Sequence, residues 1–171
     1  GPDDATVCVI NDFARWLVGR DPMDREGLWA LMYTGTRFPG GNVTNAAISG
    51  IDMALWDIAG KALGAPCYQL LGGKCRDKIR VYQGAGAPEE AKAKIEKYGY
   101  TAFKMGPHPG NSEKMRWNAV VREAAAKIRA LREAVGPDVD IGVDPHAKIF
   151  EPVCALQMAE ALAPFQPMFF E

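Results

Sequence analysis

The stretch Ile141-Gly142-Val143-Asp144-Pro145-His146-Ala147-Lys148 ends an apolar run in a cluster of polar residues. The run from Val139 to Val143 is typical of a buried parallel strand that surfaces at its carboxyl end. Alternate side chains of an extended chain point the same way. We therefore expect Asp144 and His146 to face one side of the sheet.

These two side chains suit a site for acid–base chemistry. A carboxylate can hold a hard divalent cation, and a histidine can transfer a proton near neutral pH. A structural interpretation fits the same residues equally well: a strand that ends in an Asx-type turn, followed by a solvated histidine. The rest of the chain decides between the two.

Beyond Asp77, strand patterns alternate with helix patterns. We expect strands at Ile79–Tyr82, Tyr100–Met105, Val139–Asp144 and Pro167–Glu171, and helices at Pro88–Tyr98, Asn118–Val135 and Pro152–Leu162. This alternation, with short loops after the helices, predicts a parallel α/β sheet, either a barrel or a doubly wound layer.

The first 76 residues have helical patterns only. We expect helices from Val7 to Val18, from Pro22 past Met32, and from Ala46 to Leu63, the last capped by Thr44 or Asn45 and stopped by Gly64 and Pro66. The third helix is apolar on most sides, so we expect it to lie buried between two layers. The predicted boundary therefore separates residues 1–76 from residues 77–171.

Composition excludes several classes of protein. The net charge of -1 argues against a nucleic-acid surface, and no apolar run approaches the roughly 20 residues of a membrane span. No secretory signal pattern is visible. The four cysteines form no C-x-x-C pair, which indicates free thiols in a reducing cytoplasm. A Cys67–Cys75 disulfide is the alternative.

Polar groups gather at the ends of the expected strands. Lys104, Asp144 and Glu171 each lie where a strand ends, and His146 follows closely. In a β/α barrel the active site lies at this carboxyl edge. Asp144 and Glu171 would offer two oxygens to Mg²⁺, with His146 and Lys104 as candidate acid and base. Alternatively, Lys104 only pairs with a carboxylate, and Glu171 is an ordinary charge at a strand end.

Two segments resemble a known family. Residues 48–61, ISGIDMALWDIAGK, followed by Pro66 and by LLGG at 70–73, resemble the signature of the enolase superfamily, in its mandelate racemase/muconate lactonizing enzyme group. Residues 144–152 and 164–171 are most similar to the sugar-acid dehydratases of that group, the galactonate dehydratases above all. The resemblance implies a partial TIM-type (β/α) barrel, preceded by the helical part of an α+β capping domain.

The resemblance also implies roles for single residues. Asp144 and Glu171 match the first two metal ligands, and His146 matches the histidine of a D-x-H motif that protonates the departing hydroxyl. Lys104 matches the first lysine of the racemases' K-x-K motif. Gly106 stands where the second lysine would be, which weighs against a two-base racemase.

The implied reaction removes a proton α to the carboxylate of an aldonate such as galactonate, with Mg²⁺ stabilising the ene-diolate, and eliminates β-hydroxide. The product is a 2-keto-3-deoxy acid. Arg37 and Asn42, in a loop of the capping region, are candidate substrate contacts, although a solvated loop explains them as well. A racemase or epimerase, or a homologue without dehydratase activity, is the alternative.

The length points to a part of a larger protein. A complete β/α barrel takes about 250 residues, so 171 residues accommodate a capping segment and half a barrel. We therefore expect the third metal ligand and the base to lie beyond residue 171. We also expect a cytoplasmic homo-oligomer that binds a small acid sugar, and neither nucleic acid nor membrane.

Overall fold

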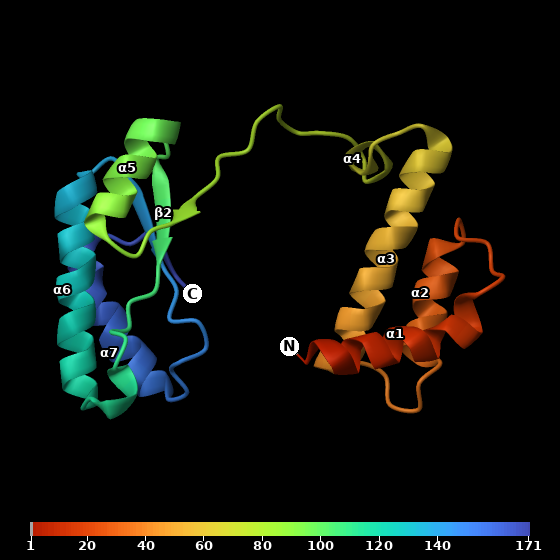
Figure 1. The fold of residues 1–171 in the computed structure, drawn as a ribbon, viewed down its shortest axis with the longest axis horizontal. Coiled ribbons are helices and arrows are strands. Elements are labelled where there is room, and N and C mark those ends of the chain that lie inside the picture. Colours follow the sequence, from red (N-terminus) through yellow and green to blue (C-terminus); the bar gives the residue numbers. More distant parts are fainter. Residues whose placement is uncertain (1) are drawn as a thin grey trace. The chain divides into compact units, whose positions relative to one another are not determined.

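The computed structural model describes residues 2–171, and their packing divides the chain after Asp77. The unit up to Asp77 is helical, whereas the unit Lys78–Glu171 contains a sheet with its helices (Figure 1). Within residues 2–171, no helix is both long and apolar enough to cross a membrane. All four cysteines are free thiols, so the alternative of a Cys67–Cys75 disulfide is wrong.

The helical unit has a small core of its own. It contains α1 (Asp3–Leu17), α2 (Arg25–Thr34), α3 (Asn42–Leu63) and the single turn α4 (Cys67–Leu70). The side chains that close this core are Phe13, Met32, Ala47 and Ile48. Gly64 ends α3 with φ 63°, a left-handed conformation that glycine adopts without steric cost, and this end is confirmed.

Two helix starts differ from the predicted ones. The Asp21 carboxylate accepts a hydrogen bond from the backbone N–H of Met23 at 2.8 Å, so Asp21 and Pro22 form a turn, and α2 begins only at Arg25. α3 begins earlier than predicted, at Asn42, because Gly41 turns the chain into the helix with φ 88°. Neither expected residue caps it, and the N-cap position is Gly41.

Within its own unit, α3 is buried on one side, and its burial between two layers stays a prediction. Ile48, Leu55 and Ala59 are buried, but Met53 and Leu63 on the same helix are exposed by 68% and 59%. The helical unit therefore does not cover all the apolar side chains of α3.

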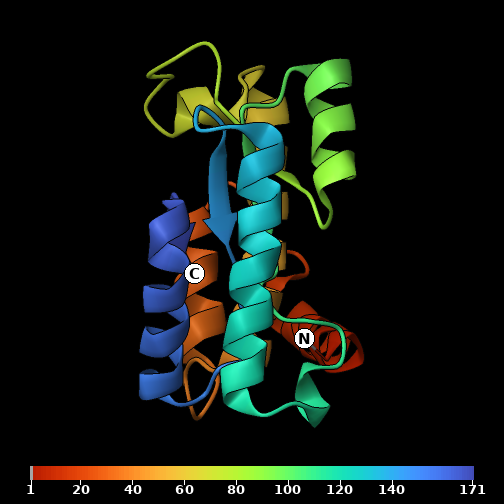
Figure 2. The ribbon, with the colours of Figure 1, turned by 90° about the vertical axis from the view of Figure 1, so that its left-hand side faces the viewer.

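The second unit confirms the parallel α/β prediction. Its four strands, β1 (Gln83–Gly84), β2 (Ala102–Met105), β3 (Asp140–Val143) and β4 (Phe169–Phe170), are all parallel and ordered β1-β2-β3-β4. The helices are α5 (Pro88–Tyr98), α6 (Trp117–Val135) and α7 (Pro152–Leu162), with short 3-10 turns η1 (Ser112–Lys114) and η2 (Ala163–Phe165). α6 packs against both α5 and α7, and Figure 2 shows α6 and α7 side by side over the sheet.

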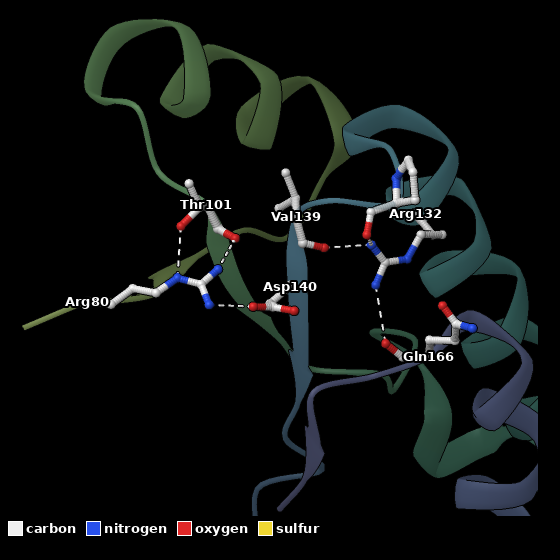
Figure 3. A network of polar contacts seen from close by, with 7 residues as sticks. Arg80, Thr101, Arg132, Val139, Asp140 and Gln166 are labelled. Atoms are coloured by element: carbon white, nitrogen blue, oxygen red, sulfur yellow. Dashed lines mark hydrogen bonds and ion pairs between the residues drawn. The ribbon is translucent and has the colours of Figure 1, made fainter.

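The first strand is not where the sequence predicts it. Residues 79–82 form no strand, and Ile79 and Val81 are exposed by 76% and 57%. Pairing starts only at Gln83, opposite Phe103. Arg80 instead reaches over the start of the sheet with its side chain, bonding to Thr101 and Asp140 (Figure 3). Apolar alternation alone does not make a strand when no neighbour pairs with its backbone.

The two faces of the sheet differ in character. Phe103, Ile141 and Val143 are fully buried under the helices, against Ile128 and Met158. The other face carries the register row Lys104, Gly142 and Phe169. A Cβ at Gly142 would lie 2.2 Å from Cζ of Phe169, so only glycine leaves room for that ring. Because strand side chains alternate, the residues two positions after Gly142 and Phe169 also face away from the helices. These residues are Asp144 and Glu171.

Candidate active site

Three predicted residues meet at the carboxyl ends of β2, β3 and β4. The Lys104 Nζ lies 2.8 Å from Oδ2 of Asp144 and 3.5 Å from Oε2 of Glu171. The sheet hydrogen bonds continue to this level, because the N–H of Asp144 donates to Met105 and that of Glu171 donates to Val143. We refer to Lys104, Asp144 and Glu171 as the rim site.

Lys104 and Asp144 stabilise each other's charged forms. Asp144 is buried, with 8% exposed, whereas the lysine side chain is 29% exposed. The hydrogen bond from Lys104 holds the pKa of Asp144 below its usual value, although burial opposes this effect. The same bond raises the pKa of Lys104. A raised pKa favours the protonated form of Lys104 while it pairs with Asp144, and this form is suited to an ion pair.

His146 reaches the rim site by a different route from the predicted one. The chain does not stay extended: His146 and Ala147 have φ 51° and 54°. The backbone N–H of His146 donates to Oδ1 of Asp144 at 2.6 Å, which is an Asx-type turn. The imidazole Nδ1 nevertheless lies 3.3 Å from Oδ2 of Asp144, and its side chain is 85% exposed. A turn, and not strand alternation, brings the two predicted residues together.

An aromatic pair lies beside the rim site, and the sequence did not reveal it. The Lys104 Nζ is 5.9 Å from the centre of the Tyr82 ring, and that ring is 5.8 Å from the ring of Phe169. Tyr82 is the last residue of the first expected strand, and this position indicated that it lies near the carboxyl edge of the sheet. Its contact with Phe169 of β4 depends on the order of the strands, which the sequence does not show. The pair places apolar surface next to the charged groups.

The donor set can be tested against Mg²⁺. Asp144 and Glu171 offer carboxylate oxygens, the hard ligands that this ion prefers, and an ammonium already lies between them. Residues 2–171 contain no group of three or more His, Cys, Asp or Glu side chains arranged for a metal. The donor set therefore fits Mg²⁺ in kind and would offer two protein ligands, which suits an ion that usually keeps several waters.

The two candidate substrate contacts lie in the helical unit. Arg37 is exposed, with its guanidinium 5.8 Å from the centre of the Phe38 ring, and Asn42 is the exposed first residue of α3. Their contact with a substrate stays a prediction.

Both units match families of known proteins. Residues 86–171 match the enolase C-terminal domain-like family, and residues 2–72 match the N-terminal domain of the mandelate racemase/muconate lactonizing enzymes. These matches confirm the resemblance that the two sequence segments indicated.

The curated relatives include enzymes with a named activity. The chain is 37% identical over 170 residues to D-galactonate dehydratase of Variovorax paradoxus, and 37% identical over 173 residues to that of Pectobacterium atrosepticum. Each match covers 95% of this chain and 44% of the relative. The chain thus spans less than half the length of these relatives.

Solved structures share the fold. An enolase from Agrobacterium radiobacter with bound Na and L-malate has a TM-score of 0.88 at 39% identity, covering 99% of this chain and 45% of its own. An enolase from Pantoea ananatis with bound D-gluconate and Mg has a TM-score of 0.84 at 30% identity, and the match covers 97% of this chain and 49% of that enolase. The 3,6-anhydro-D-galactonate cycloisomerase of Zobellia galactanivorans has a TM-score of 0.83 at 31% identity, and the match covers 99% of this chain and 47% of the cycloisomerase.

Proposed function

Because this chain belongs to the enolase superfamily, in its mandelate racemase/muconate lactonizing enzyme group, we propose that it forms part of a metal-dependent acid-sugar dehydratase. The observation that carries the proposal is the rim site, where two carboxylates from neighbouring strands face one cation at 2.8 and 3.5 Å. The D-galactonate dehydratase relatives support an aldonate such as galactonate as the substrate. The neighbour with D-gluconate and Mg supports both the substrate class and the ion.

Asp144 and Glu171 are the residues that would hold Mg²⁺. The ion would supply positive charge next to the substrate carboxylate, which favours loss of the α-proton. Lys104 keeps the two carboxylates at one place and balances their charge. The geometry favours a positioning role for Lys104, which the sequence offered as a candidate acid or base, and the base that removes the α-proton is not assigned to a residue of this chain.

His146 is the proposed general acid. Its ring lies beside Asp144 but projects into solvent, so it is free to meet a substrate above the rim site. It would give its proton to the hydroxyl that leaves the β-carbon, so that water departs and the C–O electron pair leaves with the oxygen. The Asx-type turn holds the backbone that carries this ring.

A second reaction class is supported by one neighbour. The cycloisomerase of Zobellia galactanivorans shares the fold at 31% identity, so the scaffold also serves an isomerisation. A racemase or epimerase of the same group is the related alternative. A product that contains one molecule of water less than its substrate distinguishes the dehydratase from each of these.

The test is an assay of the intact protein with Mg²⁺ and a panel of aldonates. We expect a 2-keto-3-deoxy acid to form from at least one of them. In His146→Asn, elimination should fall by about 10² or more, while exchange of the α-proton with solvent deuterium continues. Loss of exchange with normal elimination would mean that we have assigned His146 the wrong role. Normal elimination with exchange retained would mean that His146 has no catalytic role.

A further inference from the structure

A pocket of about 460 Å³ lies between the loop after β2 and the loop after β3. His108 and Trp117 line it from the first side, and Lys148 and Phe150 line it from the second. None of the rim-site residues lines the pocket, and neither does His146. The pocket is therefore separate from the groups to which we assign the dehydration.

Two lysines contribute positive charge at this pocket: Lys148 lines it, and Lys127 lies close enough to lower the pKa of His108. Neither Lys148 nor Lys127 forms an ion pair with any residue from 2 to 171, although Glu113 also lines the pocket. Lys127 donates to the carbonyl of Gly106 at 2.7 Å, which holds its ammonium at the loop after β2. Burial, and then the charges of both lysines, lower the pKa of His108. The two ammoniums attract an anion, and among the lining residues the carboxylate of Glu113 opposes them.

The amino end of α6 adds to the positive potential. Trp117, the first residue of this 19-residue helix, lines the pocket, and Arg116 before it makes no side-chain cap hydrogen bond. The first N–H groups of a helix have no partner within the helix, and the helix dipole is positive there. Ser112, which also lines the pocket, brings a hydroxyl that can donate to the same ligand.

The remaining wall is apolar. Met115, Trp117 and Phe150 line the pocket, and the indole N–H of Trp117 is already bonded to Gln157 at 2.8 Å. That bond orients the indole ring and uses its only donor, so the ring presents apolar surface to a ligand. A pocket that joins an apolar wall to an ammonium and a hydroxyl suits a ligand with an apolar body and an anionic group.

We infer that this pocket binds a small organic acid with an apolar body, its carboxylate at Lys148 and Ser112 and its body against Trp117. This is a second ligand site, additional to the one at which we place the acid sugar. Inorganic phosphate would satisfy the charge but not the apolar wall, so it should bind at least about tenfold more weakly than an aromatic carboxylate.

The probe is benzoate, titrated into the intact protein while the imidazole signals of His108 and His146 are followed by NMR. Loss of a signal in His108→Phe assigns the first histidine, and loss in His146→Asn assigns the second. We expect benzoate to shift His108 saturably and to leave His146 unchanged. Benzamide, the neutral isostere, and phosphate form the comparison arms.

Substitution of Lys148 isolates the charge. Lys148→Met should weaken benzoate binding about tenfold, the usual effect of losing a charge-assisted hydrogen bond, and should leave benzamide binding unchanged. Lys92→Met removes an exposed lysine of α5 and should change neither affinity. Circular dichroism checks that each variant is folded, and Lys148→Gln repeats the test with a polar side chain.

Three results would overturn the inference. The first is a shift of His146 in place of His108, because benzoate would then occupy the acid–base site. The second is equal affinity of Lys148→Met and the unaltered protein, or no saturable shift at all. The third is tighter binding of phosphate than of benzoate, which would make the pocket a plain oxyanion site. None of these results bears on the dehydration assay, so the two proposals fail independently.

Discussion

The two ends of the sheet use polar side chains in different ways. At the amino end, Arg132 donates to backbone carbonyls of the segments that lead into β3 and β4, including those of Val139 and Gln166 (Figure 3). Arg80 donates to the hydroxyl and the carbonyl of Thr101 and pairs with Asp140. At the carboxyl end, the ion pairs of Lys104 are with the side-chain carboxylates of Asp144 and Glu171.

The acceptors explain this difference. A backbone carbonyl keeps its place and its charge, so an arginine bonded to several carbonyls joins segments of the fold. A carboxylate can exchange one cation for another, or accept a proton. The amino end is therefore built for stability, and the carboxyl end is the one that can take part in chemistry, as the parallel arrangement of the strands leads one to expect.

The end of β1 lies at the carboxyl edge, but its polar contacts stabilise the fold, as those at the amino end do. Lys94 of α5 donates to the carbonyl of Gly84 at 2.6 Å, and Glu90 accepts from the N–H of Gly86 at 2.9 Å. The same two side chains form an ion pair. These contacts hold the loop after β1 against its helix, which leaves the ends of β2, β3 and β4 for the rim site.

The largest expected effect is at the rim site. Asp144→Asn should reduce metal-dependent turnover by more than about 10²-fold, because even residues that only orient metal ligands contribute about 10- to 100-fold. Mg²⁺ binding, measured by calorimetry on the intact protein, should weaken as well. Asp138→Asn, an exposed aspartate just before β3, is the matched control and should change neither value. Unchanged Mg²⁺ affinity in Asp144→Asn would remove the metal assignment.

At the amino end, Arg132→Met should lower the free energy of unfolding by about 2–3 kcal/mol, since several part-buried carbonyls lose their donor at once. Urea denaturation measures this loss, and Mg²⁺ affinity should stay unchanged. Arg122→Met on the same helix, at an exposed position, serves as the control. A stable Arg132→Met variant with altered metal binding would contradict the division of roles between the two ends.

A smaller effect is expected at Gly142, midway along β3. Gly142→Ala should cost about 1–2 kcal/mol of stability, because the new Cβ forces the Phe169 ring to move. Since Glu171 follows that ring on β4, Mg²⁺ affinity should fall slightly as well. The double variant with Phe169→Leu should regain part of the stability, whereas equal loss in both variants would mean that the ring is not the obstacle.

The smallest effect concerns pH and the end of β1. Hydrogen bonds, first from Lys94 and then from Gly86, lower the pKa of Glu90 from 4.5. A carboxyl group whose pKa is lower in the folded state stabilises the fold above its unfolded pKa, and this stabilisation is lost as the pH falls through the folded value. Glu90→Gln should therefore be slightly less stable than the unaltered protein at about pH 7.

The difference between these two proteins should disappear below the folded pKa of Glu90, and added salt should reduce it because the pair is exposed. Urea unfolding at several pH values provides the measurement. A constant difference at every pH would mean that the carboxylate charge contributes nothing.

Local signals predicted the helices of the second unit well. The bounds of α5 and α7 agree with the predicted Pro88–Tyr98 and Pro152–Leu162, because a proline at the first helical position marks a start within the sequence itself. The strands were predicted too long, and the first was misplaced, since a strand exists only where a neighbour pairs with it. No local pattern contains that information.

The candidate site was likewise predicted in part from local sequence signals and decided in part by the tertiary structure. From the sequence alone, strand ends predicted that Lys104, Asp144 and Glu171 would share one edge of the sheet, because all parallel strands carry their carboxyl ends to the same side. Only the tertiary structure decided that the lysine lies between the two carboxylates, and that His146 meets Asp144 through a turn with positive φ. Periodicity is a property of one segment, whereas these contacts depend on the register between strands far apart in the chain, which pairing and packing set together.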